Sequence, residues 1–335
     1  MTTRMLTILA GAALAALTAT AVEAADYTMR LSHVFPPQHP LGKMAQQYAD
    51  AVKAETNGRV AVEILGSGQA FAERESYPAV AKGQTEATLL VSVQFSGIVP
   101  TVDVLSIPFV MTGTEAPKAF LTSEGRTKLD GEIREKRVEP LAWLFQTDTS
   151  IFTSNAKPFL SPSDLAGQKI RGINQIIDAA LAKNGASPLS TPGSEVYQAL
   201  QSGVLDSALT DVSAALSRRY NEVQKYGTVI PHVITAYGIV LANPAFVAKL
   251  PPDVREQMKR AGSKVEIQGV EAGGANTREA IDGLKAKGMQ LTVLSAAQTG
   301  DWAKAMTDAS KAAFVQRTGE GGKSVIAAFE KLGGQ

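Results

Sequence analysis

The stretch from residue 167 to residue 211 alternates short strand patterns with helical patterns, and this alternation limits the fold more than any other feature of the chain. A strand pattern at 169–172 leads into a helical pattern at about 175–183, and a second helical pattern at about 195–202 leads into a strand pattern at 207–210. Strands and helices that alternate in this way build an open α/β sheet with helices on its faces. The sequence therefore predicts an α/β fold.

The first of these strands presents Arg171 at the point where a strand passes into a helix. In open α/β sheets, ligands bind at this edge of the sheet. Arginine suits a carboxylate because its planar, permanently charged fork donates two parallel hydrogen bonds. By itself, such an arginine is more often part of a surface or interdomain ion pair, so that alternative stays open.

The composition argues against several classes of function. A chain of 335 residues is long enough for two domains with sizeable cores. Its formal net charge of +1, without a basic stripe, argues against a nucleic-acid partner. With no cysteine, the chain has no thiolate nucleophile and no disulfide.

The sequence carries no motif for catalysis, a metal or a cofactor. Its three histidines, His33, His39 and His232, do not have metal-ligand spacing. It has neither a phosphate-binding loop nor a dinucleotide fingerprint. A structural role for His232 is favoured over a general-base role, because no acid or nucleophile partner is evident. We therefore predict no metal, no cofactor and no enzymatic activity.

Residues 1–24 have the pattern of a secretory signal peptide. Arg4 supplies the positive charge, 5–17 is an apolar run, and Val22-Glu23-Ala24 places small residues at a cleavage site. The apolar run is short for a membrane span, and a retained anchor is the alternative. We predict cleavage after Ala24 and export of a soluble protein to the periplasm.

Apolar runs and helical spacing predict the elements outside this stretch. The patterns favour buried strands at 87–93 and 104–109, one long helix at 114–132, and short strands at 141–145 and 150–153. A further long helical pattern runs from Pro251 past Ala280 and contains glycines at 262, 269, 273 and 274. We predict a monomer, with dimer packing through Gly269, Gly273 and Gly274 as the alternative.

Several motifs occur in a fixed order along the chain. They are Ile107-Pro108-Phe109, Asp164 to Arg171, Gly185-Ala186-Ser187-Pro188, Glu195 to Gln201, Glu222 to Tyr226, and Leu250-Pro251-Pro252-Asp253. This ordered set, preceded by a signal peptide, resembles the periplasmic substrate-binding proteins of tripartite ATP-independent periplasmic (TRAP) transporters over essentially the whole mature chain.

The resemblance implies a two-lobed periplasmic binding protein fold with discontinuous domains. Lobe I would comprise residues 25–148 and 236–276, and lobe II residues 149–235 and 277–335, joined by hinge strands and one long interdomain helix. A ligand bound in the cleft would be delivered, chemically unchanged, to the permease subunits in the membrane. A ligand-binding input protein for a membrane sensor kinase is one alternative, and an exported hydrolase is another.

The resemblance also implies a site built on Arg171, the family's contact for an organic-acid carboxylate. We predict that Asn174, Gln94 and Thr210 add hydrogen bonds. The remaining predicted pocket residues are His33, Val91, Phe152, Tyr237, Ser150 and Asp211. We predict that Phe35, Phe152 and Tyr237 form an apolar or stacking wall of the pocket, with packing of the hinge as the alternative role for each.

This chain departs from sialic-acid-binding relatives at positions that are polar there. Those positions are Val34, Val91, Gln94 and Ser150, and Gly193 opens space where an aromatic residue is common. A hydroxyl-rich sugar acid would leave hydrogen bonds unmade, and each unmet buried group costs about 1–3 kcal/mol. We therefore predict a less polar carboxylate: aromatic, branched-chain, or a small keto or hydroxy acid.

Overall fold

The computed structural model describes residues 25–333, so the predicted signal peptide at 1–24 lies outside the described residues. The strands are β1 (Tyr27–Ser32), β2 (Val60–Leu65), β3 (Ala87–Val91), β4 (Glu139–Ser154), β5 (Lys169–Gly172), β6 (Ser187–Ser190), β7 (Ser207–Asp211), β8 (Tyr226–Ala242) and β9 (Gln290–Val293). The α-helices are α1 (Pro40–Glu55), α2 (Ser76–Ala81), α3 (Ala116–Phe120), α4 (Glu124–Arg134), α5 (Gln175–Lys183), α6 (Val196–Gln201), α7 (Val212–Ser217), α8 (Pro244–Lys249), α9 (Pro252–Ala286), α10 (Ala296–Thr318) and α11 (Glu320–Glu330). The 3-10 helices are η1 (Ser92–Gln94), η2 (Pro100–Ser106), η3 (Pro162–Leu165) and η4 (Tyr220–Glu222).

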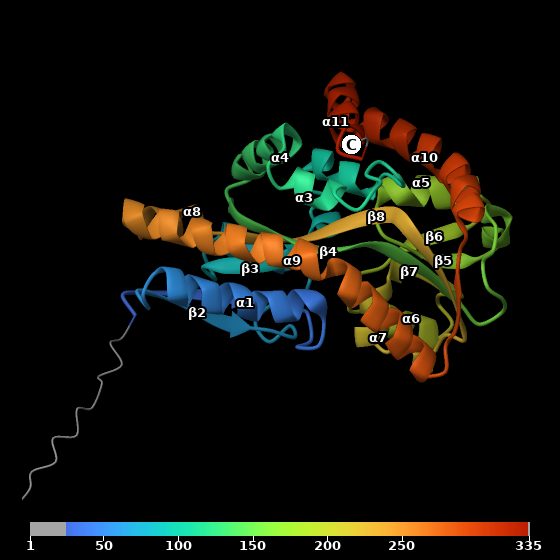
Figure 1. Cartoon of the computed structure of the whole chain (residues 1–335), viewed down its shortest axis with the longest axis horizontal. Helices are drawn as coiled ribbons and strands as arrows, with labels where there is room; N and C mark the ends of the chain where they lie inside the picture. The colour runs from blue at the N-terminus through green and yellow to red at the C-terminus, as the bar shows by residue number, and fades with distance from the viewer. Residues whose placement is uncertain (1–24, 334–335) are drawn as a thin grey trace, which may run out of the picture.

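One sheet runs through the whole molecule. Its order is β2-β1-β3-β8-β4-β7-β5-β6, and β9 pairs with β8 outside this path. The two central strands, β4 and β8, are antiparallel and contain 16 and 17 residues. One half of β8 pairs with β3, and the far half of β4 pairs with β7 (Figure 1). These two strands therefore cross between the two ends of the molecule, as the prediction of hinge strands requires.

The long helix α9 contains 35 residues and crosses the front of the sheet (Figure 1). Its glycines allow close packing: a Cβ on Gly262 would lie 2.8 Å from the Leu141 carbonyl oxygen. A Cβ on Gly273 would lie 2.5 Å from the Phe145 ring. These glycines therefore serve contacts within the chain. Of the glycines considered for dimer packing, Gly274 is the exposed one. The predicted α/β fold with one long helix is confirmed.

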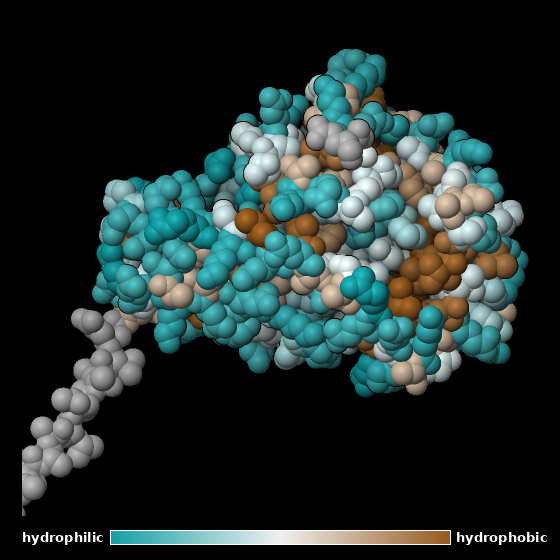
Figure 2. Space-filling view, viewed as in Figure 1, coloured by the Kyte–Doolittle hydropathy of each residue, from teal (hydrophilic) through white to brown (hydrophobic). Residues whose placement is uncertain are grey.

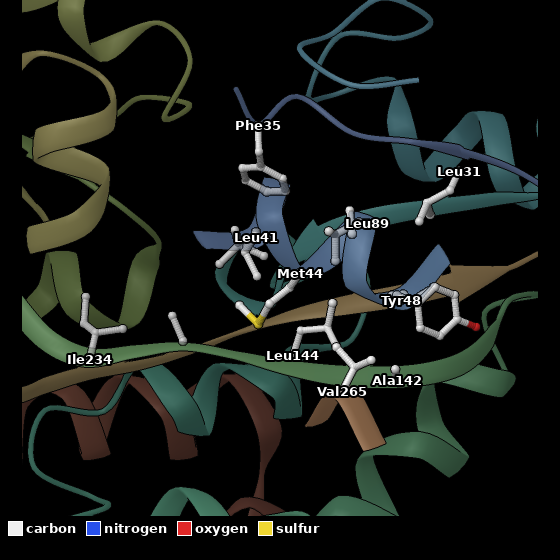
Figure 3. Packing of buried hydrophobic residues seen from close by; sticks show 14 of the residues in the cluster. Leu31, Phe35, Leu41, Met44, Tyr48, Leu89, Ala142, Leu144, Ile234 and Val265 are labelled. Atoms are coloured by element: carbon white, nitrogen blue, oxygen red, sulfur yellow. The ribbon is translucent and has the colours of Figure 1, made fainter. Parts of the chain in front are cut away.

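The hydrophobic core lies on both faces of the central strands, because successive strand residues point to opposite faces. Ala142 and Leu144 of β4 pack with Met44 of α1 and Val265 of α9, as Figure 3 shows. Trp143 points the other way, into the cluster beneath α4 and α11. The sheet is therefore covered on both sides.

Helix α1 illustrates how local sequence sets this packing. Its apolar residues recur at helical spacing and are buried: Leu41, Met44, Ala45, Tyr48 and Val52. The His39 side chain caps the start by accepting a hydrogen bond from the Leu41 backbone N–H. The helix ends where Asn57 and Gly58 adopt positive φ angles of 51° and 80°.

Two predicted elements between residues 104 and 132 differ from the structure. The run at 104–109 is not a strand, because its first part belongs to the 3-10 helix η2. A short apolar run does not distinguish a buried strand from a buried helix. The long helix expected at 114–132 is divided into α3 and α4, since the Ser123 hydroxyl caps a new helix at the Arg126 backbone N–H.

The two short strands expected at 141–145 and 150–153 are one continuous strand, β4. The polar residues between them stay in the sheet, where the pairing with β8 changes register between Phe145 and Thr147 and again between Thr147 and Thr149. Such irregularities keep a polar stretch in the sheet. The lobe boundaries predicted from the sequence stay a prediction.

The surface is hydrophilic over most of the left side of the molecule, where α1, β2 and α8 lie (Figure 2). Among residues 25–333, no helix combines the length and the apolar character that a membrane span requires.

Candidate ligand-binding site

A cavity lies between residues of both predicted lobes, beside the central strands. The empty volume in and around it, including space open to solvent, is about 490 Å³. Its lining residues are Val91, Val93, Gln94, Gln146, Thr147, Ser150, Arg171, Ile173, Gly193, Thr210, Asp211, Arg218, Ile234 and Ala236. A more open cleft adjoins it and shares Val93, Gln94, Arg171 and Ile173 with it. The cavity and the cleft therefore share the wall that carries Arg171.

Arg171 is the most constrained cation of the cavity. Strand β5 presents it between β6 and β7, and the residue is 8% exposed. Its Nε–H donates to the Thr191 carbonyl oxygen at 3.1 Å, and Nη1 donates to the Leu209 carbonyl oxygen at 2.9 Å. These two backbone acceptors fix the guanidinium while leaving Nη2 without a hydrogen-bond partner among the described residues.

No carboxylate within the described residues forms an ion pair with Arg171. Burial lowers the pKa of its guanidinium, yet arginine remains a cation at neutral pH. A buried charge without a partner is costly, and an anion bound beside it removes that cost. The geometry of Arg171 therefore favours binding of an anion from solution.

Three acids, Asp211, Glu73 and Asp178, lie near Arg171, but each already accepts a hydrogen bond from another donor; Asp178 Oδ1 accepts from the Ile173 backbone N–H at 2.9 Å. Asp211 caps α7: its Oδ1 accepts from the Ala214 backbone N–H at 2.7 Å, and its Oδ2 accepts from Gln146 Nε2 at 2.6 Å. Burial raises the pKa of the Asp211 carboxyl. Neither oxygen of Asp211 is therefore free to neutralise the arginine directly.

Glu73 is the second acid, and it joins the two predicted lobes. Its carboxylate accepts hydrogen bonds from the Ser194 hydroxyl at 3.0 Å and from the backbone N–H groups of Gly193 and Ser194, both at 3.3 Å. It also accepts a hydrogen bond from the Gln94 side chain. Glu73 thus ties the segment before α2 to the segment before α6.

Arg218 is a second cation of the cavity, and sequence analysis did not single it out. It ends α7 and is half-buried. A Cβ on Gly193 would lie 1.9 Å from Arg218 Nη1, so the guanidinium occupies the space beside this glycine. In the sequence, the glycine at position 193 indicates open space in the pocket. It does not indicate that Arg218, 25 positions further along the chain, occupies that space.

Several residues predicted from the sequence lie together in the cavity wall. They are Arg171, Val91, Gln94, Ser150, Thr210 and Asp211. Ser150 and Asp211 are direct partners in the β4–β7 register, which explains why they meet. The cavity lining also includes apolar residues and a glutamine that sequence analysis did not select, namely Val93, Ile173, Ile234, Ala236 and Gln146.

Asn174 lies in the adjoining cleft rather than in the cavity wall. Its Oδ1 caps α5 by accepting from two backbone N–H groups, both at 3.2 Å. Its Nδ2 donates to Asp103 Oδ1 at 3.0 Å and to Ser106 Oγ at 2.8 Å. A ligand contact by Asn174 stays a prediction and would require one of these bonds to break.

The structure does not bring His33, Phe152 or Tyr237 to the cavity. His33 lines a separate hollow beside Gly66, its Nδ1 accepts from the Phe35 backbone N–H at 3.2 Å, and burial lowers its pKa to about 4. Phe152 packs against Trp302, with ring centroids 4.8 Å apart.

Tyr237 is fully buried, and its hydroxyl donates to the Pro117 carbonyl oxygen at 2.8 Å. It follows Ala236 on β8 and therefore points to the opposite face of the sheet. Phe35, also considered as an apolar wall, stacks on His39 with ring centroids 4.8 Å apart. Core packing thus accounts for the positions of these aromatic side chains.

Within residues 25–333, no group of three or more His, Cys, Asp or Glu side chains is arranged to hold a metal ion. The cavity therefore offers arginine, amide and hydroxyl groups for recognition of a ligand.

Comparison with known proteins identifies the family. Residues 31–317 match the model of the bacterial extracellular solute-binding proteins, family 7. The chain is 27% identical to the C4-dicarboxylate-binding periplasmic protein DctP of Rhodobacter capsulatus over 311 residues, which are 92% of each chain.

Solved structures have the same fold. A TRAP periplasmic solute-binding protein from Desulfovibrio salexigens with bound orotic acid has a TM-score of 0.85 and 27% identity, covering 92% of this chain and 99% of that one. A TRAP periplasmic solute-binding protein from Sulfurospirillum deleyianum with bound succinate has a TM-score of 0.81 and 28% identity, with the same coverage. The chain therefore belongs to the bacterial extracellular solute-binding proteins of family 7, the periplasmic solute receptors of TRAP transporters, and is a receptor and not an enzyme.

Proposed function

We infer that this protein captures a small organic acid through Arg171 and delivers it to the membrane subunits of a TRAP transporter. The observation that carries this proposal is the buried guanidinium of Arg171, which faces a cavity and has no carboxylate partner among the described residues. The bound succinate and orotic acid of the two similar structures are both carboxylates, which supports the same class of ligand here. Residues 1–24 would direct export to the periplasm.

Closure of the two lobes on the ligand is part of the proposal. The cavity takes Val91 and Gln94 from proposed lobe I and Arg171 and Thr210 from proposed lobe II. A ligand held between them adds contacts that only the closed form provides, so binding favours closure. The hydrogen bond from the Ser194 hydroxyl to the Glu73 carboxylate also joins the two proposed lobes.

The remaining lining favours an acid with few hydroxyl groups. Val91, Val93, Ile173, Ile234 and Ala236 form an apolar part of the cavity wall. A polyhydroxylated sugar acid would leave hydrogen bonds unmade against this wall, at about 1–3 kcal/mol for each group. We therefore propose an aromatic or branched-chain carboxylate, or a small keto or hydroxy acid.

One polar group of the wall selects among these classes. Gln146 Oε1 is buried and has no hydrogen-bond donor within the described residues, whereas Nε2 of the same amide is held by Asp211. Buried acceptors are nearly always paired. A hydroxyl group on the ligand would satisfy this oxygen, which favours a small hydroxy acid within the proposed class.

A thermal-stability screen of residues 25–335 tests the proposal. The panel contains aromatic, branched-chain, keto and hydroxy acids together with sugar acids. A ligand at a hundredfold excess over its dissociation constant stabilises the folded protein by about 2.7 kcal/mol. We expect stabilisation by small acids with few hydroxyl groups. Stabilisation by sugar acids alone would contradict the proposed selectivity. No stabilisation by any acid, repeated after unfolding and dialysis to remove a co-purified ligand, would contradict carboxylate binding.

A further inference from the structure

Asp178 lies against the backbone of the strand that carries Arg171. It belongs to the first turn of α5 and is half-buried, and its Oδ1 accepts from the Ile173 backbone N–H at 2.9 Å. A Cβ on Gly172 would lie 2.5 Å from each of the two carboxylate oxygens. The carboxyl group of Asp178 therefore occupies the side-chain space of the residue directly after Arg171.

Arg171 links Asp178 to the ligand cavity. Asp178 lines the open cleft but not the cavity, whereas Arg171 lines both. An anion bound in the cavity and the Asp178 carboxylate would be two negative charges beside one guanidinium. Like charges in a partly buried space repel, so each of the two anions weakens the hold of Arg171 on the other.

One oxygen of Asp178 is able to take up a proton. Its Oδ2 accepts no hydrogen bond from any side chain or backbone group within residues 25–333. Both oxygens of Asp211, in contrast, are held by donors, and a proton there would break one of those bonds. Burial raises the pKa of the Asp178 carboxyl to about 6, although the Ile173 N–H and the charge of Arg171 lower it. Asp178 therefore changes its charge close to neutral pH.

The other charged groups around α5 have partners of their own or lie across the cleft. Helix α5 packs against β5, β6, α10 and η2, and β6 has no titratable side chain. The groups that face α5 are Arg171 of β5, Asp103 of η2, Arg317 of α10, and Glu73 and Arg74 across the cleft. Asp103 and Arg317 pair with each other at 3.7 Å. Arg171 is the cation whose charge acts on Asp178.

We propose that Asp178 tunes the affinity of the receptor: as a carboxylate it weakens anion binding by Arg171, and capture of the ligand is accompanied by uptake of one proton from solvent onto Asp178 Oδ2. This inference rests on the proposed function, in which Arg171 holds a carboxylate. It makes Asp178 a residue that acts on the ligand through Arg171, without touching the ligand itself.

The direction of the pH dependence follows from the charges. A bound anion adds a negative charge near Asp178 and raises the pKa of its carboxyl above the value of about 6 in the free protein. The complex then holds the proton more tightly than the free protein, so affinity rises as pH falls through this range. A ligand-induced rise of about one pH unit in this pKa gives roughly sixfold tighter binding at about pH 5.5 than at about pH 7.5.

Titration calorimetry at these two pH values tests the proposal. The probes are lactate, pyruvate, isovalerate and benzoate, one from each proposed class of acid. They stay mostly ionised at about pH 5.5, because an ordinary carboxyl group has a pKa of about 4. Phosphate and imidazole buffers differ in ionisation enthalpy, so the heats measured in both should report uptake of about half a proton at about pH 6.5.

Asp178→Asn keeps the shape of the side chain and an oxygen for the Ile173 N–H, but it stays neutral. At about pH 7.5 this variant should bind the tightest probe at least threefold more tightly than the unmodified protein, and without proton uptake. A gain in affinity separates this role from a structural one, because damage to the strand that carries Arg171 would weaken binding.

Two further variants serve as controls. Asp308→Asn removes the same charge from an exposed position on α10, outside the lining of both the cavity and the cleft. It should change neither affinity nor proton uptake. Asp103→Asn removes the other acid beside α5, whose pKa burial raises to about 7, and it should leave the proton uptake on binding in place. Circular dichroism checks that each variant is folded.

The possible results separate the two proposals. If the probes bind equally well at both pH values, the role of Asp178 is overturned while carboxylate binding by Arg171 stands. The same holds if Asp178→Asn retains the proton uptake or if Asp103→Asn abolishes it. If none of the acids binds to the unmodified protein after removal of any co-purified ligand, both proposals are overturned.

Discussion

Replacement of Gly262 by alanine tests how α9 is seated on the sheet. The added Cβ would lie 2.8 Å from the Leu141 carbonyl oxygen and 3.4 Å from Ala142 Cβ. Leu141 belongs to the central strand β4, so its backbone has little freedom to move away. Overpacking of this kind costs about 1–3 kcal/mol, whereas alanine is better than glycine inside a helix by about 1 kcal/mol. We expect a net destabilisation of about 0–2 kcal/mol.

Gly274→Ala is the matched control in the same helix. Gly274 is exposed, and the nearest atom to its added Cβ is the tip of Arg278, at 3.6 Å. The helix-propensity gain therefore stands alone, and we expect stabilisation by about 1 kcal/mol. The two variants should differ by about 1–3 kcal/mol, because the overpacking term acts on Gly262 alone.

Urea unfolding followed by circular dichroism measures this difference, since the midpoint shifts at constant slope when stability alone changes. The reasoning would be refuted if Gly262→Ala were as stabilising as Gly274→Ala. That result would mean that α9 moves away from β4 without loss of packing.

Three further predictions concern acidic side chains. Glu266→Ala should lower the free energy of unfolding by about 3–5 kcal/mol, because Arg126 loses bonds of 2.7 and 2.9 Å; thermal unfolding measures this loss. Burial raises the pKa of Asp103 to about 7, so the folded state binds the proton more tightly and stability should fall as pH rises from about 4 through 7. Asp103→Asn should reduce this decline in unfolding temperature measured against pH, and Asp178, whose pKa burial raises to about 6, contributes to the part that remains. Glu73→Gln should weaken ligand binding about fivefold by calorimetry, through loss of about 1 kcal/mol at the Ser194 bond.

The sequence predicts the part of the site that depends on local pattern. Arg171 lies near the end of a strand that precedes a capped helix, a pattern that by itself leaves an interdomain ion pair as the alternative, and the family resemblance favours the ligand-binding role. Ser150, Thr210 and Asp211 follow from the family resemblance, and the register between β4 and β7 then pairs Ser150 with Asp211. Helix α9 follows from its length and spacing.

The remaining features depend on contacts through space. Arg218 caps the end of α7, and nothing in the local sequence indicates that it lines a cavity. Its guanidinium lies in the cavity wall because Gly193, in another loop, has no side chain there. Tyr237 and Phe152 were expected in the pocket, and their packing on opposite sides of the sheet depends on which helix covers each face. The division of the expected helix into α3 and α4 depends on the N-cap formed by the Ser123 side chain, which the spacing of apolar residues does not indicate.

Binding of a carboxylate by Arg171 is the central claim, and titration calorimetry of Arg171→Gln tests it most directly. The titrant is the acid that stabilises the unmodified protein most in the screen. Loss of a charge-assisted, buried pair of about 3 kcal/mol predicts an affinity about 100-fold weaker. Because the variant also removes an unpaired buried charge, its unfolding temperature without ligand should not fall. An affinity within threefold of the unmodified protein, in a variant that remains folded, would contradict the account.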